Sequence, residues 1–168
     1  MEARIALFGC VVLGSTLCGH RIAGLSRRRE RLLTDVLAAA RRLKASMLGM
    51  LEPVPDALSH SGNAVFEEIG RRMADGASAR EAWKQVLNAG SAHHLGLFAL
   101  DAQDRQVLER LFERLGESGR EAQEIHLSAA VEALESRTQD AESQRKQSTA
   151  LSTRLGFLVG LMLGLIFL

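Results

Sequence analysis

The stretch LERLFERLGESGREAQEIHLSAAVEALE, residues 108–135, decides the fold of this chain. Apolar residues recur every three or four positions on both sides of Gly116, which is the period of amphipathic helices. Ser118 and Glu121 have the S-x-x-E spacing of a capping box, in which the two residues cap each other's backbone amides. The stretch therefore predicts two helices joined by a tight turn.

The second of these helices is expected to be long. No Gly or Pro occurs between Gly119 and Gly156, so about 37 residues, or roughly 55 Å, can remain helical. The helix begins amphipathic, but residues 135–150 are almost wholly polar. A helix that is polar all round is either a solvated bridge or part of an assembly. We therefore expect residues 135–150 to form a polar helical connector.

The chain ends in LGFLVGLMLGLIFL, residues 155–168, which carries no charge. These residues cover only about 21 Å of the roughly 30 Å hydrocarbon core of a bilayer. We predict a C-terminal transmembrane segment over residues 151–168, which can cross the bilayer if the Arg154 side chain extends its charged group to the membrane surface. Alternatively, the segment crosses a locally thinned bilayer or packs against a partner helix. Three glycines recur every four residues on one face, which favours helix packing, although glycine is common in membrane helices. They are Gly156, Gly160 and Gly164.

Residues 26–134 are expected to form one modest bundle of consecutive helices. Residues 26–50 show an apolar stripe with a basic opposite face, and Pro53 and Pro55 end this helix because proline lacks an amide donor. A second S-x-x-E capping box, at Ser78, predicts another helix start. Residues 91–100 are either a loop or an ambiguous apolar stretch.

The N-terminal run IALFGCVVLGSTLCG, residues 5–19, leaves three interpretations open. A cleaved signal peptide has the right apolar length but lacks an A-x-A-like site. A lipoprotein acylation site at Cys10 would come too early in the chain. An uncleaved anchor over residues 1–25 is favoured, because the arginines that follow resist translocation. The expected inner-leaflet flank comprises Arg27, Arg28, Arg29, Arg31 and, near the other end, Arg154.

The average composition does not show that apolar residues gather at the two ends of the chain and charged residues between them. The 168 residues carry 21 Lys and Arg against 20 Asp and Glu, so the net charge of +1 gives no case for a nucleic-acid binder. Two cysteines exclude a disulfide-rich secreted module. Aromatic residues are only 4 % of the chain, and strand-favouring residues are scarce, so the composition predicts an all-α protein.

Motifs for chemistry are missing. The sequence has no phosphate-binding or dinucleotide-binding glycine motif, no H-E-x-x-H and no C-x-x-C. His93 and His94 are adjacent, and helix neighbours do not share a face, so a joint metal site is not expected. We therefore predict no catalytic, cofactor-binding or metal-binding residue, and no small-molecule substrate. A membrane-tethered enzyme with an unrecognised site is the competing hypothesis.

Three stretches of the sequence carry a resemblance to a known family. Two of them are EPVPDAL at 52–58 and GASAREAWKQVL at 76–87. The most specific lies within 108–135 and consists of Leu115, Gly116, Ser118, Arg120, Glu121, Gln123 and His126. On these residues, and over nearly its whole length, the chain resembles the stage III sporulation protein AB family. The family usually has Asp where Gly119 stands, which implies a looser start to the long helix.

The resemblance implies a non-enzymatic platform subunit of a secretion-like channel between mother cell and forespore. It implies a six-helix bundle similar to the cytoplasmic domain of the type II secretion platform protein F. The implied partners are a cytoplasmic secretion-type ATPase, other membrane subunits of the channel and membrane lipid, with no nucleic acid. From position in the chain, we infer a candidate partner interface of Pro53, Pro55, Ser118, Arg120 and Glu121.

The prediction is therefore an all-α protein with a small cytoplasmic bundle of about six helices, flanked by transmembrane helices. Its parts are an anchor (1–25), the bundle (26–134), the connector (135–150) and the C-terminal segment (151–168). It is expected as a multi-pass protein of the mother-cell membrane that faces the forespore. The alternative is a membrane-anchored adaptor that binds anionic lipid or nucleic acid through its basic first helix.

Overall fold

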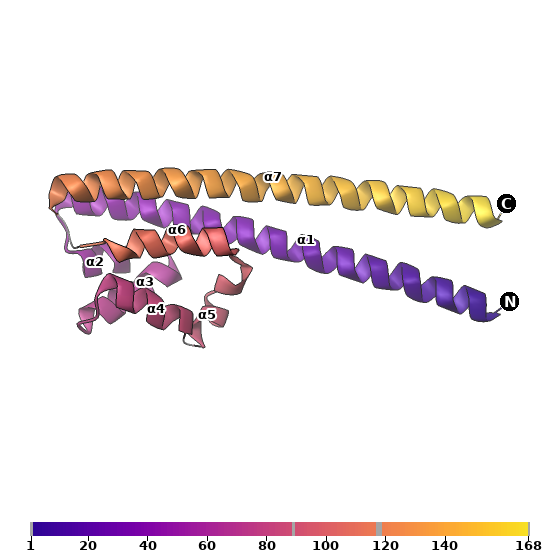
Figure 1. Cartoon of the computed structure of the whole chain (residues 1–168), viewed down its shortest axis with the longest axis horizontal. Coiled ribbons are helices and arrows are strands. Elements are labelled where there is room, and N and C mark those ends of the chain that lie inside the picture. Colours follow the sequence, from indigo (N-terminus) through magenta and orange to yellow (C-terminus); the bar gives the residue numbers. More distant parts are fainter. Residues whose placement is uncertain (1, 89, 117–118, 168) are drawn as a thin grey trace.

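The predicted all-α class is confirmed. The computed structural model describes the backbone of residues 2–88, 90–116 and 119–167, and the side chains of 24–88, 90, 92–116 and 119–147. The described residues form helices and connecting turns, with no strand among them (Figure 1). In chain order they are α1 (Glu2–Ala45), a π-helical turn η1 (Ser46–Met50), α2 (Val54–Ser59), α3 (Ala64–Ala74), α4 (Ala79–Asn88), α5 (Ser91–His94), a 3-10 turn η2 (Leu97–Ala99), α6 (Ala102–Glu113) and α7 (Arg120–Phe167).

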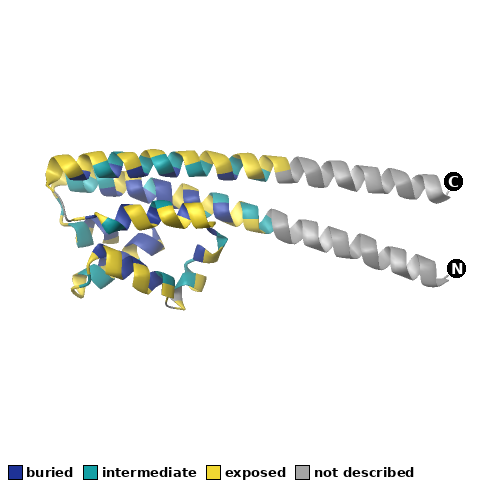
Figure 2. Ribbon diagram, in the orientation of Figure 1, coloured by how far each residue is buried: buried dark blue, intermediate teal, exposed yellow. Residues whose placement is uncertain are grey.

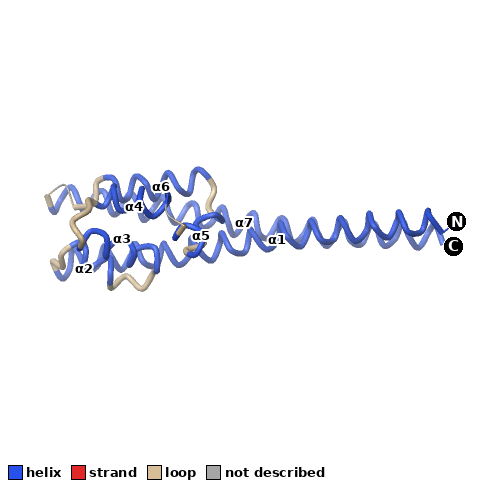
Figure 3. Tube along the Cα trace, turned by 90° about the horizontal axis from the view of Figure 1, so that it is seen from below, coloured by secondary structure: helices blue, strands red, loops and turns tan. Residues whose placement is uncertain are grey.

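Two long helices, α1 and α7, run side by side in opposite directions, so both chain ends lie at the same end of the molecule (Figure 1). Helices α2 to α6 pack on the half of this pair that is far from the chain ends (Figure 3). The long predicted helix is confirmed, and α7 continues through the three glycines to Phe167. The break predicted at Pro53 is also confirmed, because α1 and η1 end before it.

Within the part of the chain that the structure describes, no helix carries an apolar stretch long enough to cross a membrane. The two predicted membrane segments, 1–25 and 151–168, fall almost wholly on residues whose side chains lie outside that part. The predicted packing glycines, Gly156, Gly160 and Gly164, and Arg154 lie on the α7 backbone but outside the residues whose side chains are described.

The core consists of aliphatic side chains and one aromatic cluster. The buried residues of each helix lie on the side that faces this core (Figure 2). Phe112 of α6 is central: its ring centroid lies 5.3 Å from that of Phe66 and 5.4 Å from that of Trp83. All three side chains are at most 1 % exposed. Burial of this kind contributes about 1.5–3 kcal/mol for each large apolar side chain.

Local signals fix where the short helices begin. The predicted capping box at Ser78 is present, since the Glu81 carboxylate accepts from the Ser78 amide and hydroxyl, both at 3.0 Å. Asn63 caps α3 by accepting from the amide of Val65 at 3.0 Å. Helix α3 then packs closely on α2 at Gly70, where a Cβ would lie 2.8 Å from the carbonyl oxygen of Pro55. Ser118, in the other predicted box, lies outside the described residues.

The polar stretch predicted as a connector packs against α1 over its described part. The Arg41–Glu135 pair joins the two helices at 2.6 Å, and the Arg145–Glu30 pair at 2.7 Å. Between them Ala141 is only 1 % exposed. Residues 135–147 are thus the partner helix of α1, and their polarity serves contacts across that pair as well as solvent.

Candidate interaction site

The structure brings together the two turns that were predicted to form a partner interface. The α1–α2 turn and the α6–α7 turn both lie at the end of the molecule farthest from the chain ends (Figure 1). Arg120 Nη2 donates to the carbonyl oxygen of Leu48 at 2.7 Å, which ties the start of α7 to the η1 turn that follows α1. Gly116 faces Val54, whose Cγ2 lies 3.5 Å from the place of a Cβ. The two turns therefore make one surface.

We name this surface the turn end. Pro53, Arg120 and Glu121 are exposed there, whereas Pro55 is half-buried and its carbonyl oxygen accepts from the Ser59 hydroxyl at 2.9 Å. Ser118, the remaining predicted residue, lies outside the described part. The turn end is therefore defined by the described residues Met50, Leu51, Pro53, Pro55, Arg120 and Glu121.

The turn end also contains two apolar side chains that were not predicted from the sequence. Met50 is 78 % exposed and Leu51 is 66 % exposed. Leu51 has φ 56°, a left-handed conformation that L residues with large side chains rarely adopt, while its amide donates to the Ser46 carbonyl. This backbone turn presents both side chains to solvent. The only signal in the sequence is an apolar stripe that continues past the end of its helix.

The outer face of α7 next to the turn end is acidic. Glu121, Glu124 and Glu132 line a shallow hollow there together with Ile125, which is 67 % exposed. An exposed aliphatic side chain among carboxylates suits a partner that is both apolar and basic. The turn end and this face together carry both kinds of contact.

The predicted basic flank divides in the structure. Arg27, Arg28 and Arg31 are exposed, as expected for a flank. Arg29, which was predicted as part of the inner-leaflet flank, is only 7 % exposed and points into the bundle. The physical reason is its position: it falls on the same face of α1 as Leu33 and Val36, which are fully buried.

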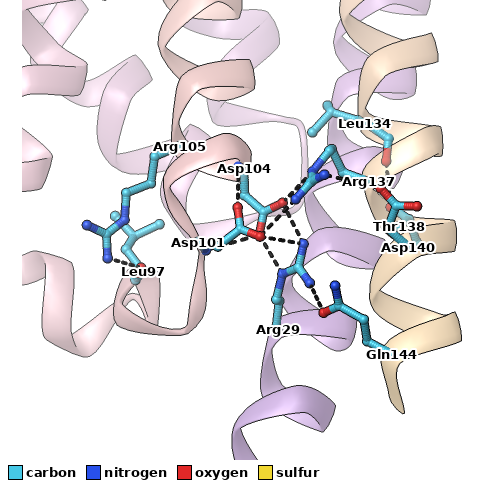
Figure 4. A network of polar contacts seen from close by, with 10 residues as sticks. All are labelled: Arg29, Leu97, Asp101, Asp104, Arg105, Leu134, Arg137, Thr138, Asp140 and Gln144. Atoms are coloured by element: carbon cyan, nitrogen blue, oxygen red, sulfur yellow. Dashed lines mark hydrogen bonds and ion pairs between the residues drawn. The ribbon is translucent and has the colours of Figure 1, made fainter. Parts of the chain in front are cut away.

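Arg29 belongs to a polar network that joins α1, α6 and α7 (Figure 4). Its Nε donates to Asp104 Oδ2 at 2.6 Å and its Nη2 donates to Asp104 Oδ1 at 2.9 Å. From the other side, Arg137 Nε donates to Asp104 Oδ1 at 2.9 Å. Arg137 also pairs with Asp101 at 2.8 Å, and Arg29 Nη1 donates to Gln144 at 2.6 Å.

The network keeps Asp104 ionised although its side chain is fully buried. Burial by itself would raise the pKa of this carboxyl, because a charge is costly away from water. Hydrogen bonds from Arg29 and Arg137, together with the Asp101 amide, outweigh burial and hold the pKa below its usual range. Conversely, the hydrogen bond to Asp104 raises the pKa of Arg29 despite burial. The three charges therefore act as one structural unit.

The sequence analysis did not predict this network. A signal was present, because Asp104 lies on the stripe formed by Leu108 and Leu111. Arg137 likewise continues the stripe of α7. A charged residue in register with a buried stripe indicates a paired charge inside the core.

Among the described residues, no three His, Cys, Asp or Glu side chains are grouped so that they could hold a metal ion. The rings of His93 and His94 lie 6.5 Å apart between centroids and meet at 81°. The described geometry therefore offers contact surfaces and a structural ion network.

The family model for stage III sporulation protein AB matches residues 4–168. The chain belongs to the stage III sporulation protein AB family. A relative, stage III sporulation protein AB of Bacillus subtilis (strain 168), is 26 % identical over 166 residues, which cover 94 % of this chain and 95 % of the relative. The resemblance noted from the sequence is thus confirmed.

A solved structure of stage III sporulation protein AB matches with a TM-score of 0.59 and 23 % identity. The match covers 71 % of this chain and 98 % of that structure. This likeness shows the fold alone. The helical arrangement described above is therefore that of the stage III sporulation protein AB family.

Proposed function

We propose that the chain is a non-enzymatic platform subunit of a sporulation channel complex in the mother-cell membrane, with its bundle in the cytoplasm. Both chain ends would sit in the membrane, and the turn end would dock a cytoplasmic secretion-type ATPase. The observation that carries this proposal is that two turns far apart in sequence form one exposed surface opposite the chain ends (Figure 1).

Distance supports this arrangement. From Arg27 to Ala45, α1 advances by about 27 Å at 1.5 Å per residue. The turn end therefore stands roughly that far from the basic flank, within reach of a partner in the cytoplasm. The exposed Met50, Leu51 and Ile125 supply apolar anchors, and the neighbouring carboxylates supply charge.

Docking is tested by co-purification of the candidate ATPase with the full chain in detergent. Glu124→Lys reverses a charge on the acidic face beside the turn end and should weaken binding of a basic partner by at least about tenfold, because like charges across an interface are costly. Lys84→Glu, a charge reversal at an exposed residue of α4, is the control and should leave binding unchanged. Equal binding by both variants and the parent chain would overturn the docking site.

Topology is tested by labelling a single cysteine at Ser78 after replacing Cys10 and Cys18 with serine. A membrane-impermeant maleimide should modify this cysteine only after the cells are permeabilised. Modification in intact cells would place the bundle outside and refute the proposal.

Packing of the C-terminal segment against another membrane subunit is tested at Gly160. Gly160→Leu adds bulk to the glycine face and should reduce co-purification of the other channel membrane subunits. Met162→Leu, which lies on a different face by helix geometry, is the control. Unchanged assembly in the glycine variant would count against a glycine packing face.

A further inference from the structure

A groove lies between residues 24–35 of α1 and the α5–η2 segment. The α5–η2 segment is on the side of the bundle that faces the chain ends (Figure 1). Its volume is about 940 Å³. Neither the family match nor the docking proposal gives this groove a role. We name it the basal groove, after its place at the base of the bundle.

Cationic and hydrogen-bonding side chains line the basal groove. Arg28 and Arg31 come from α1, and His93 and His94 from α5; all four side chains are exposed. Among the lining residues that the structure describes, Asp35 is the single carboxylate. Within the described part of the chain, no carboxylate forms an ion pair with Arg28 or Arg31, so both guanidinium groups remain available to an anion from outside.

Apolar surface borders these cations. Leu25 is 50 % exposed and Phe98 is 41 % exposed. The Phe98 ring is held from two sides: the Arg28 guanidinium carbon lies 5.9 Å from its centroid, and the His93 ring stacks on it at 5.1 Å. The main chain beneath is fixed as well, since Arg105 donates to the Leu97 carbonyl oxygen at 3.4 Å. The groove thus presents cationic side chains and apolar side chains next to each other in a fixed arrangement.

The place of the basal groove in the chain indicates what kind of ligand it would bind. Leu25 ends the predicted anchor, so the basal groove opens where α1 would leave the bilayer. Cations beside exposed apolar side chains match the boundary between headgroups and acyl chains, where Lys and Arg attract anionic lipid. We propose that the basal groove binds the phosphate headgroup of an anionic phospholipid while Leu25 and Phe98 contact its acyl chains. This inference rests on the membrane anchoring proposed above.

The test uses the full chain carrying Phe98→Trp, reconstituted into mixed phosphatidylcholine and phosphatidylglycerol vesicles. Bromine is placed on the acyl chains of one lipid or of the other, and quenching of the new tryptophan reports which lipid lies beside the groove. Trp83 is buried in the core and provides the constant background emission. Flotation of the same vesicles separately reports whether the chain is held by the membrane.

Stronger quenching by brominated phosphatidylglycerol is expected. Arg28→Gln and Arg31→Gln should each lower the preference for phosphatidylglycerol about fivefold, which corresponds to about 1 kcal/mol. Arg27→Gln, an exposed residue outside the groove lining, should keep the preference. Each arginine substitution is also made in a chain that keeps Phe98, where the emission of Trp83 alone verifies that the variant is folded.

The outcomes separate the two claims. A chain that floats but shows equal quenching by both lipids, or none, overturns the groove while membrane anchoring stands. An equal loss of preference in Arg27→Gln would reduce the effect to general surface charge and also overturn the groove. A chain that does not float overturns both the anchoring and the groove.

Discussion

Replacing Asp104 with Asn should cost more stability than any substitution of an exposed charge. Each carboxylate oxygen accepts two N–H groups: Oδ2 from Arg29 Nε and the Asp101 amide, and Oδ1 from Arg29 Nη2 and Arg137 Nε. An amide NH₂ in either place therefore faces two donors, and it leaves Arg29 with only the partly exposed Asp101, 3.0 Å away, as its counter-charge. Removing one partner of a buried ion pair costs about 3–5 kcal/mol.

The assay is urea unfolding of the full chain in mild detergent, followed by the fluorescence of Trp83. With a denaturant slope of about 1–3 kcal/mol/M, the midpoint of Asp104→Asn should fall by at least about 1 M. The matched control is Arg41→Gln, because the Arg41–Glu135 pair also joins two helices but is 58 % and 40 % exposed. An exposed pair of this kind contributes about 0–1 kcal/mol. If both variants lose the same stability, the network is not the charged core that we infer.

Two further measurements sharpen this test. In Arg29→Met/Asp104→Leu no buried charge is left unpaired, since Arg137 keeps Asp101 and Asp140, so the double variant should recover most of the loss. The pH dependence follows from the lowered pKa of Asp104. Its contribution is present above the unfolded pKa of about 3.9 and is lost as the pH falls through the lower folded value. The parent chain should therefore lose stability below about pH 4, and Asp104→Asn should lose less there.

Three other substitutions probe packing and capping by the same unfolding assay. Gly70→Ala should destabilise by about 1–3 kcal/mol because its Cβ has no room, whereas Gly49→Ala, which meets open space, should be neutral or stabilising. Phe112→Ala should cost about 3–5 kcal/mol and shift the emission of the neighbouring Trp83 to the red. Asn63→Ala should cost about 1 kcal/mol through loss of the α3 cap, and no loss would show that the cap is dispensable.

Periodicity and caps predicted most of the helices from the sequence. The stripe of residues 26–50, the break at Pro53 and the cap at Ser78 all depend on neighbours within a few positions, so they can be read locally. The short helices of 91–100 were not predicted as helices, because such short turns take their shape from the surfaces they cover. The burial of Arg29 was missed because its partner lies 75 residues away.

The sequence prediction named residues of both turns as one candidate partner interface from their position in the chain, but no pattern in the sequence showed that the two turns meet. The antiparallel course of α1 and α7 brings residue 48 beside residue 120, and nothing local to either turn encodes that contact. The left-handed Leu51 was equally hidden, because leucine has no preference for this conformation.

The Arg29–Gln144 contact bears on how the chain folds during synthesis. The two residues are 115 positions apart, so at about 5–20 residues per second Arg29 is made about 6–23 s before Gln144. Asp104 appears earlier, but Arg137 and Gln144, which complete the site, come last. A nascent chain stalled before α7 would keep an open cleft where that helix belongs. Among the described helices, α7 is thus the one that is made last and that closes the core, and termination before it would yield a substrate for chaperones and proteases.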